Sequence, residues 1–336
     1  MRWLLIVGFL AACSGAPAAP AAAPTVAPAL SAGTGSTAPA ARVPAQTYAV
    51  PSGMRPHDVA PALDGGVWFT AQGSGELGWL DARSGEVRRI ALGRGSAPHG
   101  VIVAPDGAAW ITDGGLNAVV RVDGRTNEVK RFAVPRANAG LNTATFDRNG
   151  WLWFTGQSGV IGSLDPATGE VRVFDAPRGG GPYGMTTTPS GEVYFASLAG
   201  SYVGRIDVTT GAVTILEPPT KGQGARRVWS DSKGRIWVSE WNAGQLGMYD
   251  PAKNAWREWK LPGERPMAYA VYVDDADVVW VTDFGAQAIV RFDPVAETFA
   301  SVPLAPGSDV RQLLGRSGEV WGAESGRDAL VVVRRG

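Results

Sequence analysis

The chain has 336 residues, of which 45% are hydrophobic and 18% are charged, and its 31 Lys and Arg balance its 31 Asp and Glu. Zero net charge supplies no basic field for nucleic acid, so no nucleic-acid partner is expected. The single Cys excludes an intrachain disulfide, and the 45 Gly and 13 Trp suit short repeats with tight turns and one large aromatic residue each.

Residues 1–13 indicate an export signal. A basic start is followed by the apolar run 3–11 and then by Leu-Ala-Ala-Cys, which ends at Cys13. The apolar run is too short to span a bilayer. Small residues directly before a Cys resemble a bacterial lipoprotein signal, in which that Cys is lipidated. We therefore expect an exported protein, held by acyl chains on Cys13 at the extracytoplasmic face of the cell envelope. The alternative is an ordinary secretory signal with an incidental Cys.

Residues 14–45 consist almost entirely of Ala, Pro, Ser, Gly and Thr. Such a segment has too few large apolar side chains to build a core, so it is predicted to be a disordered tether. The functional domain is expected to comprise residues 46–336.

A repeat with a period of 41 to 43 residues fills that domain. Each repeat has an aromatic residue, here called the anchor, near the start of its second apolar run and after a turn rich in Gly and Asp. The anchors are Trp68, Trp110, Trp153, Tyr194, Trp237, Trp280 and Trp321. Short apolar runs separated by turns predict strands. Seven equal repeats therefore predict an all-β fold, a seven-bladed β-propeller of four-stranded antiparallel blades. An irregular β-sandwich, the alternative, gives no reason for equal spacing.

The two ends of the domain complement each other. The seventh repeat ends after its third strand, at 329–333, whereas 46–51 (QTYAVP) matches the fourth strand of a blade, 130–135 (KRFAVP). We expect the N-terminal strand to complete the last blade and close the ring.

Two positions in each repeat are predicted to face one mouth of the central channel. The first lies eleven residues before the anchor, with one deletion in the last repeat, and holds His57, His99, Asn142, Tyr183, Arg226, Tyr269 and Arg311. The second lies three residues after the anchor and holds Ala71, Asp113, Gly156, Ser197, Glu240, Asp283 and Glu324.

The two His of the chain share the same phase of neighbouring repeats. A neutral His is suited to general-base catalysis, and the alternative is a structural role. Ring closure would bring Asp309, Arg311 and Glu324 of the last blade beside His57, His99 and Asp113 of the first two. The carboxylates Asp113, Glu324 and Asp309 could bind a divalent cation. Glu240 and Asp283 form a second acidic arc, for which a rim without catalytic role is the alternative.

The Pro-His-Gly-Val of 98–101, the Trp-Ile-Thr-Asp of 110–113 and the stretch LWFTGQSGVIGSLDPATGEV at 152–171 resemble the streptogramin B lyases, also called virginiamycin B lyases, over 46–336. The resemblance implies a seven-bladed propeller. It also implies a metal-assisted carbon–oxygen lyase that opens a cyclic ester or depsipeptide by elimination, with Mg²⁺ as the expected metal.

The same resemblance implies roles for individual residues. His99 would be the general base and His57 would bind substrate, and Asp113 lies close to the place of a metal-binding Glu. Ala97 stands where the resemblance places another such Glu. The remaining residues of the first position are expected to bind substrate, and these are Arg311, Tyr183, Tyr269, Arg226 and Asn142.

Two other functions remain open. One is a non-catalytic propeller that binds a glycan, a peptide or a partner protein at the cell envelope. The other is a calcium-dependent, lactonase-like hydrolase with Asn142, Glu240 and Asp283 among its ligands. In each case we expect a monomer whose ligand is a small cyclic ester or peptide, or an envelope partner.

Overall fold

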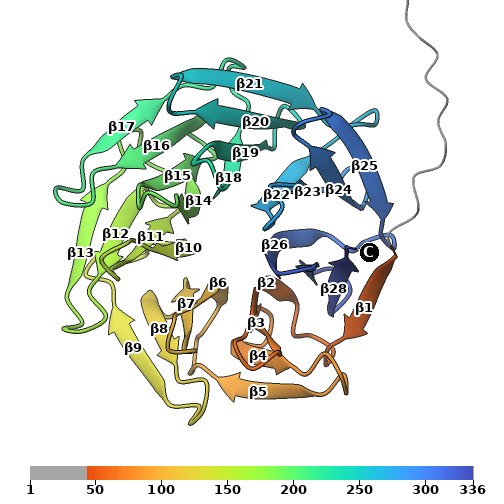
Figure 1. Cartoon of the computed structure of the whole chain (residues 1–336). Coiled ribbons are helices and arrows are strands. Elements are labelled where there is room, and N and C mark those ends of the chain that lie inside the picture. The colour runs from red at the N-terminus through yellow and green to blue at the C-terminus, as the bar shows by residue number, and fades with distance from the viewer. Residues whose placement is uncertain (1–43, 336) are drawn as a thin grey trace, which may run out of the picture. The chain divides into compact units, whose positions relative to one another are not determined.

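The computed structural model describes residues 44–335 and confirms a seven-bladed propeller (Figure 1). Its 28 strands form seven four-stranded antiparallel sheets arranged around a central channel. The export signal at 1–13 with Cys13, and the tether at 14–45 except for its last two residues, lie outside the described residues. No helix among the described residues is long and apolar enough to cross a membrane.

In six blades, four consecutive strands follow one another outward from the channel, and in the seventh the N-terminal strand is the outermost one. The innermost strands are β2 (Pro56–Pro61), β6 (Pro98–Val103), β10 (Leu141–Phe146), β14 (Pro182–Thr187), β18 (Ala225–Ser230), β22 (Ala268–Val273) and β26 (Val310–Arg316). The second strands are β3 (Val67–Ala71), β7 (Ala109–Asp113), β11 (Leu152–Gly156), β15 (Val193–Ser197), β19 (Ile236–Glu240), β23 (Val279–Asp283) and β27 (Glu319–Glu324). The third strands are β4 (Glu76–Leu80), β8 (Ala118–Val122), β12 (Val160–Leu164), β16 (Tyr202–Ile206), β20 (Gln245–Asp250), β24 (Ala288–Asp293) and β28 (Ala329–Arg334). The outermost strands are β5 (Val87–Ala91), β9 (Val129–Ala133), β13 (Val171–Asp175), β17 (Val213–Leu216), β21 (Ala255–Lys260), β25 (Thr298–Pro303) and β1 (Ala45–Ala49).

The N-terminal strand closes the ring as predicted. Strand β1 pairs with β28 in antiparallel register, from Ala45 opposite Val333 to Ala49 opposite Ala329. It begins one residue earlier than expected and ends at Ala49. The last blade therefore contains both ends of the described chain, and its outer edge is covered by β1.

The turn before each anchor also holds the anchor in place. In three blades the buried indole N–H donates to an Asp six residues earlier, from Trp153 to Asp147 at 3.0 Å and from Trp237 to Asp231 at 2.9 Å. Trp280 and Asp274 make the same bond at 2.9 Å. A buried indole N–H needs an acceptor, which explains why an Asp-containing turn and a Trp recur together in the sequence.

Packing within a blade depends on complementary volumes in the second and third strands. Phe154 on β11 lies opposite Gly162 on β12, and a Cβ at Gly162 would come within 2.1 Å of the Phe154 ring. The second blade fills the same space with Ile111 opposite Val120. A large side chain on one strand is therefore matched by Gly on the other, and two medium-sized side chains fill the same space in the second blade.

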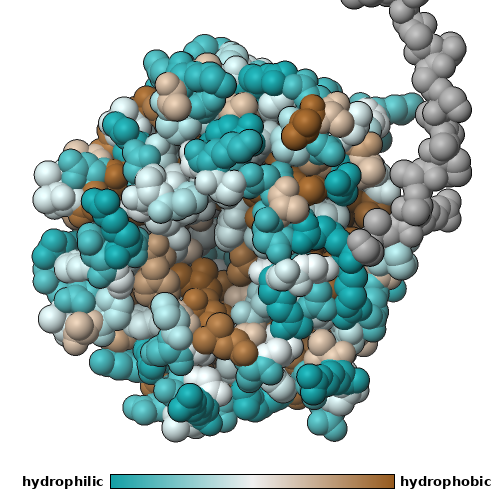
Figure 2. Space-filling view, in the orientation of Figure 1, coloured by the Kyte–Doolittle hydropathy of each residue, from teal (hydrophilic) through white to brown (hydrophobic). Residues whose placement is uncertain are grey.

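Apolar side chains also gather at the molecular surface in one place. Figure 2 shows them beside the central opening, over the blades that carry β2 and β6. Apolar residues in the second halves of the inner strands line a cavity, among them Val101, Ile102, Leu313 and Leu314.

Candidate functional site

The structure brings the first set of predicted site residues together at one level of the channel. Each is the second residue of an innermost strand, and we call the set the inner ring: His57, His99, Asn142, Tyr183, Arg226, Tyr269 and Arg311. In every blade the pairing register between the innermost and second strands shifts directly after this level. Such a bulge re-aims side chains, so residues at successive positions can both reach the channel.

The two His of the inner ring pack against each other. Their ring centroids are 3.7 Å apart, and the side chains are 2% and 7% exposed. Burial first, and then the charge of Arg227, lowers the pKa of His57 well below its ordinary value. Burial and the neighbouring His57 do the same to the pKa of His99. Both imidazoles are therefore neutral at pH 7.

One ring nitrogen of His99 makes no hydrogen bond to the described residues. Its Nε2 lies 3.2 Å from Asn142 Nδ2, whereas its Nδ1 is buried and has no partner among the described residues. The Asn142 amide can present either its N–H or its oxygen to Nε2. With the oxygen there, Nε2 holds the proton and the lone pair of Nδ1 can act as a base.

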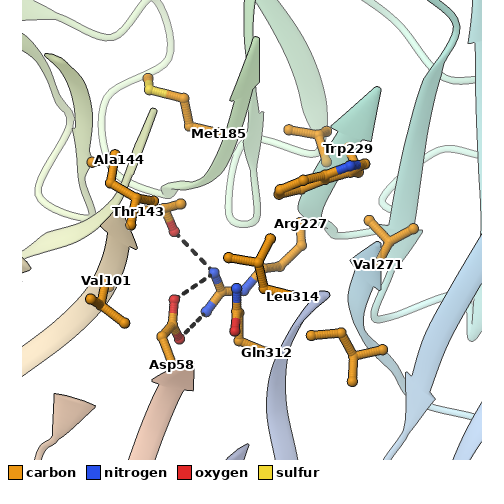
Figure 3. A pocket seen from close by; sticks show the side chains of 14 residues that line it. Asp58, Val101, Thr143, Ala144, Met185, Arg227, Trp229, Val271, Gln312 and Leu314 are labelled. Carbon is orange, nitrogen blue, oxygen red and sulfur yellow. Dashed lines mark hydrogen bonds and ion pairs between the residues drawn. The ribbon is translucent and has the colours of Figure 1, made fainter. Parts of the chain in front are cut away.

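An ion pair crosses the channel one residue deeper (Figure 3). Arg227 Nη2 lies 2.7 Å from Asp58 Oδ1 and Arg227 Nη1 lies 3.1 Å from Asp58 Oδ2, with 5% and 2% of the side chains exposed. Arg227 Nη1 also donates to Thr143 Oγ1 at 3.2 Å, and His57 Nδ1 lies 2.8 Å from Asp58 Oδ1. The pair joins β2 to β18 and borders a cavity of about 30 Å³, room for a few water molecules at most.

Aromatic residues and a second Arg occupy the other side of the inner ring. The Arg226 guanidinium lies 3.6 Å from the Tyr269 ring centroid and 4.6 Å from that of Tyr183. The two Tyr hydroxyls are 2.7 Å apart. Trp241 and Phe284, from the loops that follow β19 and β23, pack edge-on and stacked against Tyr269.

Asp113 and Asp283, two acidic residues of the second position, accept hydrogen bonds from the backbone of neighbouring loops. Asp113 Oδ1 accepts from the backbone N–H of Ala97 and of Leu116, each at 2.9 Å, and its Oδ2 accepts from Ser96 Oγ at 2.5 Å. Asp283 Oδ1 accepts from the N–H of Met267 at 2.8 Å in the same way. These carboxylates therefore satisfy backbone donors beside the channel mouth.

The other predicted acidic residues lie apart from the His pair. Asp309 Oδ1 accepts from Gln287 Nε2 at 3.0 Å. Burial raises the pKa of Glu324. Burial also raises the pKa of Glu240 to about 8, although Gln245 Nε2 donates to Glu240 Oε2 at 2.6 Å.

These donors do not fit the divalent metal that the resemblance implies. Within residues 44–335, the one group of at least three His, Cys, Asp or Glu ligand atoms within 4.8 Å of one another is His57, Asp58 and His99. Asp58 is already bound to Arg227, and Mg²⁺ prefers several oxygen ligands. Asp113, Glu324 and Asp309 are outside this group, and Ala97 offers no ligand atom.

Glu240 gives a pH-dependent prediction. Its pKa is about 8 when folded against an ordinary value of 4.5, so between these values the folded protein holds a proton that the unfolded chain releases. The stabilisation of the folded state by protonated Glu240 is complete below pH 4.5 and is lost as pH rises through about 8. We expect urea unfolding from pH 5 to 8 to show that the free energy of unfolding of Glu240→Gln, relative to that of the wild type, rises by about 1.4 kcal/mol per pH unit. A constant difference between the two proteins would contradict the pKa.

Sequence reasoning missed a set of hydroxyls that positions the inner ring. Thr70 Oγ1, two residues after its anchor, accepts from Asp58 N at 2.9 Å and donates to His99 O on the next blade at 2.7 Å. Ser239 Oγ likewise donates to Tyr269 O at 2.7 Å. Thr112 Oγ1 and Thr155 Oγ1 donate in the same way to the carbonyl oxygens of Asn142 and Tyr183. The recurring Thr or Ser at this position of the repeat was a usable signal.

Comparisons with known proteins agree with this architecture. A sequence model of the Virginiamycin B lyase family matches residues 35–292. The structure of virginiamycin B lyase from Staphylococcus aureus is similar, with a TM-score of 0.81 and 19% identity over 87% of this chain and 99% of that one. A catalytically inactive histidine-to-alanine variant of the same enzyme with Quinupristin gives the same values. YCF48 bound to D1 peptide matches at a TM-score of 0.69 and 15% identity, over 87% of this chain and 97% of that one. No curated relative matches this chain in sequence.

Proposed function

The chain belongs to the virginiamycin B lyase family, and from that premise we propose that it opens a cyclic ester or depsipeptide by elimination, with His99 as the general base. The observation that carries this proposal is the His pair. Two neutral imidazoles begin successive inner strands with their ring centroids 3.7 Å apart, and Nδ1 of His99 has no partner among the described residues. The relative that a histidine-to-alanine change makes catalytically inactive supports a His as the essential group.

The proposed step needs no water. His99 Nδ1 takes the proton from the carbon next to a carbonyl group, and the electron pair forms a carbon–carbon double bond with the neighbouring carbon. The bond from that neighbouring carbon to the ester oxygen breaks, and the oxygen leaves as a carboxylate. His57, held by Asp58 at 2.8 Å, keeps the His99 ring in place and faces the substrate. A neutral base with a lowered pKa remains unprotonated below neutral pH.

Elimination and hydrolysis give products that differ by one water. We expect the purified protein to convert Quinupristin into a ring-opened, unsaturated product of unchanged mass. When the reaction is run in water labelled with heavy oxygen, mass spectrometry should find no label in this product. A labelled product that is heavier by one water would identify a hydrolase and support the lactonase-like alternative. An intact substrate that nevertheless binds would support the non-catalytic function.

The non-catalytic alternative has an observation in its favour. The carboxylates of the second position bind backbone donors, as Asp113 does with Ala97 N and Leu116 N, and Ala97 lacks the ligand atom that the family resemblance expects. A propeller of this kind would bind a peptide or glycan at the same mouth. YCF48, a propeller of similar fold, is described with a bound D1 peptide.

We also propose that the protein is an exported lipoprotein. The support is the sequence before Cys13, where small residues follow a short apolar run. Acyl chains would hold the propeller at a membrane surface. In cells fed radiolabelled palmitate, we expect the wild-type protein to carry the label and to be found in the membrane fraction. Cys13→Ser should be unlabelled and absent from the membrane fraction. Unlabelled wild-type protein in the soluble extracytoplasmic fraction would favour the ordinary secretory signal.

A further inference from the structure

We propose that Arg226 and Arg311 form a carboxylate-binding site at the mouth of the channel, on either side of Tyr269. The two residues are the second residues of β18 and β26 and flank Tyr269 on β22. For its reaction the inference rests on the proposed function, because the leaving group there is a carboxylate. As a binding site it stands independently.

Both guanidinium groups lack an anionic partner. Among the described residues neither forms an ion pair with a carboxylate, and Nε of each is buried without a hydrogen-bond partner. Asp58, the carboxylate at the next level of the channel, is taken by Arg227 and His57. Both Arg side chains are half-buried, where an unpaired charge is costly. An oxyanion from a ligand would remove that cost.

The positive charge of these arginines lowers the pKa values of Tyr269 and His57 beside them. Although burial raises the pKa of Tyr269, the charges of Arg226 and Arg227, the hydrogen bond with Tyr183 and the charge of Arg311 together hold it below its ordinary value. The pKa of His57 is lowered mainly by burial and further by the charges of the same three arginines. A mouth bordered by charges of one sign concentrates ligands of the opposite sign.

The geometry suits a carboxylate attached to a flat apolar group. Tyr269 and Trp241 fix the plane of the Arg226 guanidinium, with ring centroids 3.6 and 4.8 Å from its Cζ. The Arg311 Cζ lies 6.0 Å from the Tyr269 centroid. Guanidinium groups bind carboxylates through paired N–H donors. Half-buried Trp241 and Phe284 offer aromatic surface beside them.

These arginines would supply the charge stabilisation that the carboxylates of this chain do not provide through a metal. As the carbon–oxygen bond breaks, its electron pair moves to the ester oxygen and the proton stays on His99. The new carboxylate is then bound by Arg226 and Arg311. Preorganised donors aimed at developing charge lower the barrier of such a step.

Isothermal titration with phenylacetate and its neutral isostere phenylacetamide tests the site without requiring turnover. We expect wild type to bind phenylacetate more tightly than phenylacetamide. Arg226→Gln and Arg311→Gln should each weaken phenylacetate binding at least about tenfold, as expected for a hydrogen bond to a charged group. Arg205→Gln is the matched control, because Arg205 is exposed on β16 and pairs with Glu192. Thermal unfolding checks that each variant is folded, and Arg226→Lys and Arg311→Lys should retain part of the affinity.

Equal binding of the two probes, no phenylacetate binding at millimolar concentration, or unchanged affinity in both folded Gln variants would overturn the inference. The outcome is separate from that of the proposed function. Charge-selective binding without ester opening would leave the site and remove the lyase activity. Ester opening at the wild-type rate in both Gln variants would leave the lyase activity and remove the role of the arginines.

Discussion

Replacing Arg227 with Met is expected to lower the free energy of unfolding by about 3–5 kcal/mol. Arg227 pairs with Asp58 through both guanidinium nitrogens, at 2.7 and 3.1 Å, and both side chains are almost fully buried. Without Arg227, the Asp58 carboxylate would keep only neutral His57 as a hydrogen-bond partner among the described residues. Urea unfolding at pH 7 measures the loss.

Two further variants separate the charge effect from packing. Adding Asp58→Asn to Arg227→Met removes the stranded charge and keeps an oxygen for His57 Nδ1, so most of the stability should return. Arg205→Met removes an exposed pair with Glu192 and should cost at most about 1 kcal/mol. If Arg227→Met were no less stable than Arg205→Met, the ion pair would not stabilise the ring.

Replacing His99 with Ala is expected to lower the rate of ester opening by about 10²–10⁴-fold, the usual contribution of a general base. The loss should appear in kcat, since His99 acts on the proton in the transition state. Wild-type kcat should stay level as pH falls to 6.5 and decline only at lower pH, because burial and His57 lower the pKa of His99. Steady-state kinetics with Quinupristin from pH 5 to 8 provides both measurements.

His57→Ala serves as the comparison for that experiment. His57 touches the His99 ring but is held by Asp58, so its loss should raise KM and lower kcat less than the loss of His99. Equal kcat in wild type and His99→Ala would assign the base to another residue and remove the central claim of the proposed function.

The repeat was enough to predict the fold and the inner ring. A fixed phase places every residue eleven before an anchor, or ten in the last repeat, at the same point of its blade. Closure by the N-terminal strand follows from the missing fourth strand of the last repeat. For this reason His57 and Arg311, which are far apart in sequence, could be assigned to one channel mouth.

The direction of individual side chains could not be predicted in the same way. A strict alternation would turn Asp58 away from the channel if His57 faced it, but the register shift between Pro56 and Val59 lets both reach it. Asp58 then meets Arg227, which is 169 residues away, and no local pattern encodes that contact. Likewise, an acidic residue such as Asp113 looks the same in sequence whether it binds a cation or the N–H of Ala97.

Closure of the ring by β1 also determines how the propeller would respond to mechanical load. Any force transmitted along the chain before Ala45 is carried first by the five residue pairs that join β1 to β28. Ala45 and Val333 form the terminal pair of the β1–β28 ladder, so a pulling force at Ala45 acts first on that pair. The pairs of the ladder would then separate one after another, and the first element to detach would be the outer strand of the last blade. The inner strands that carry the His pair would still be in place at that point.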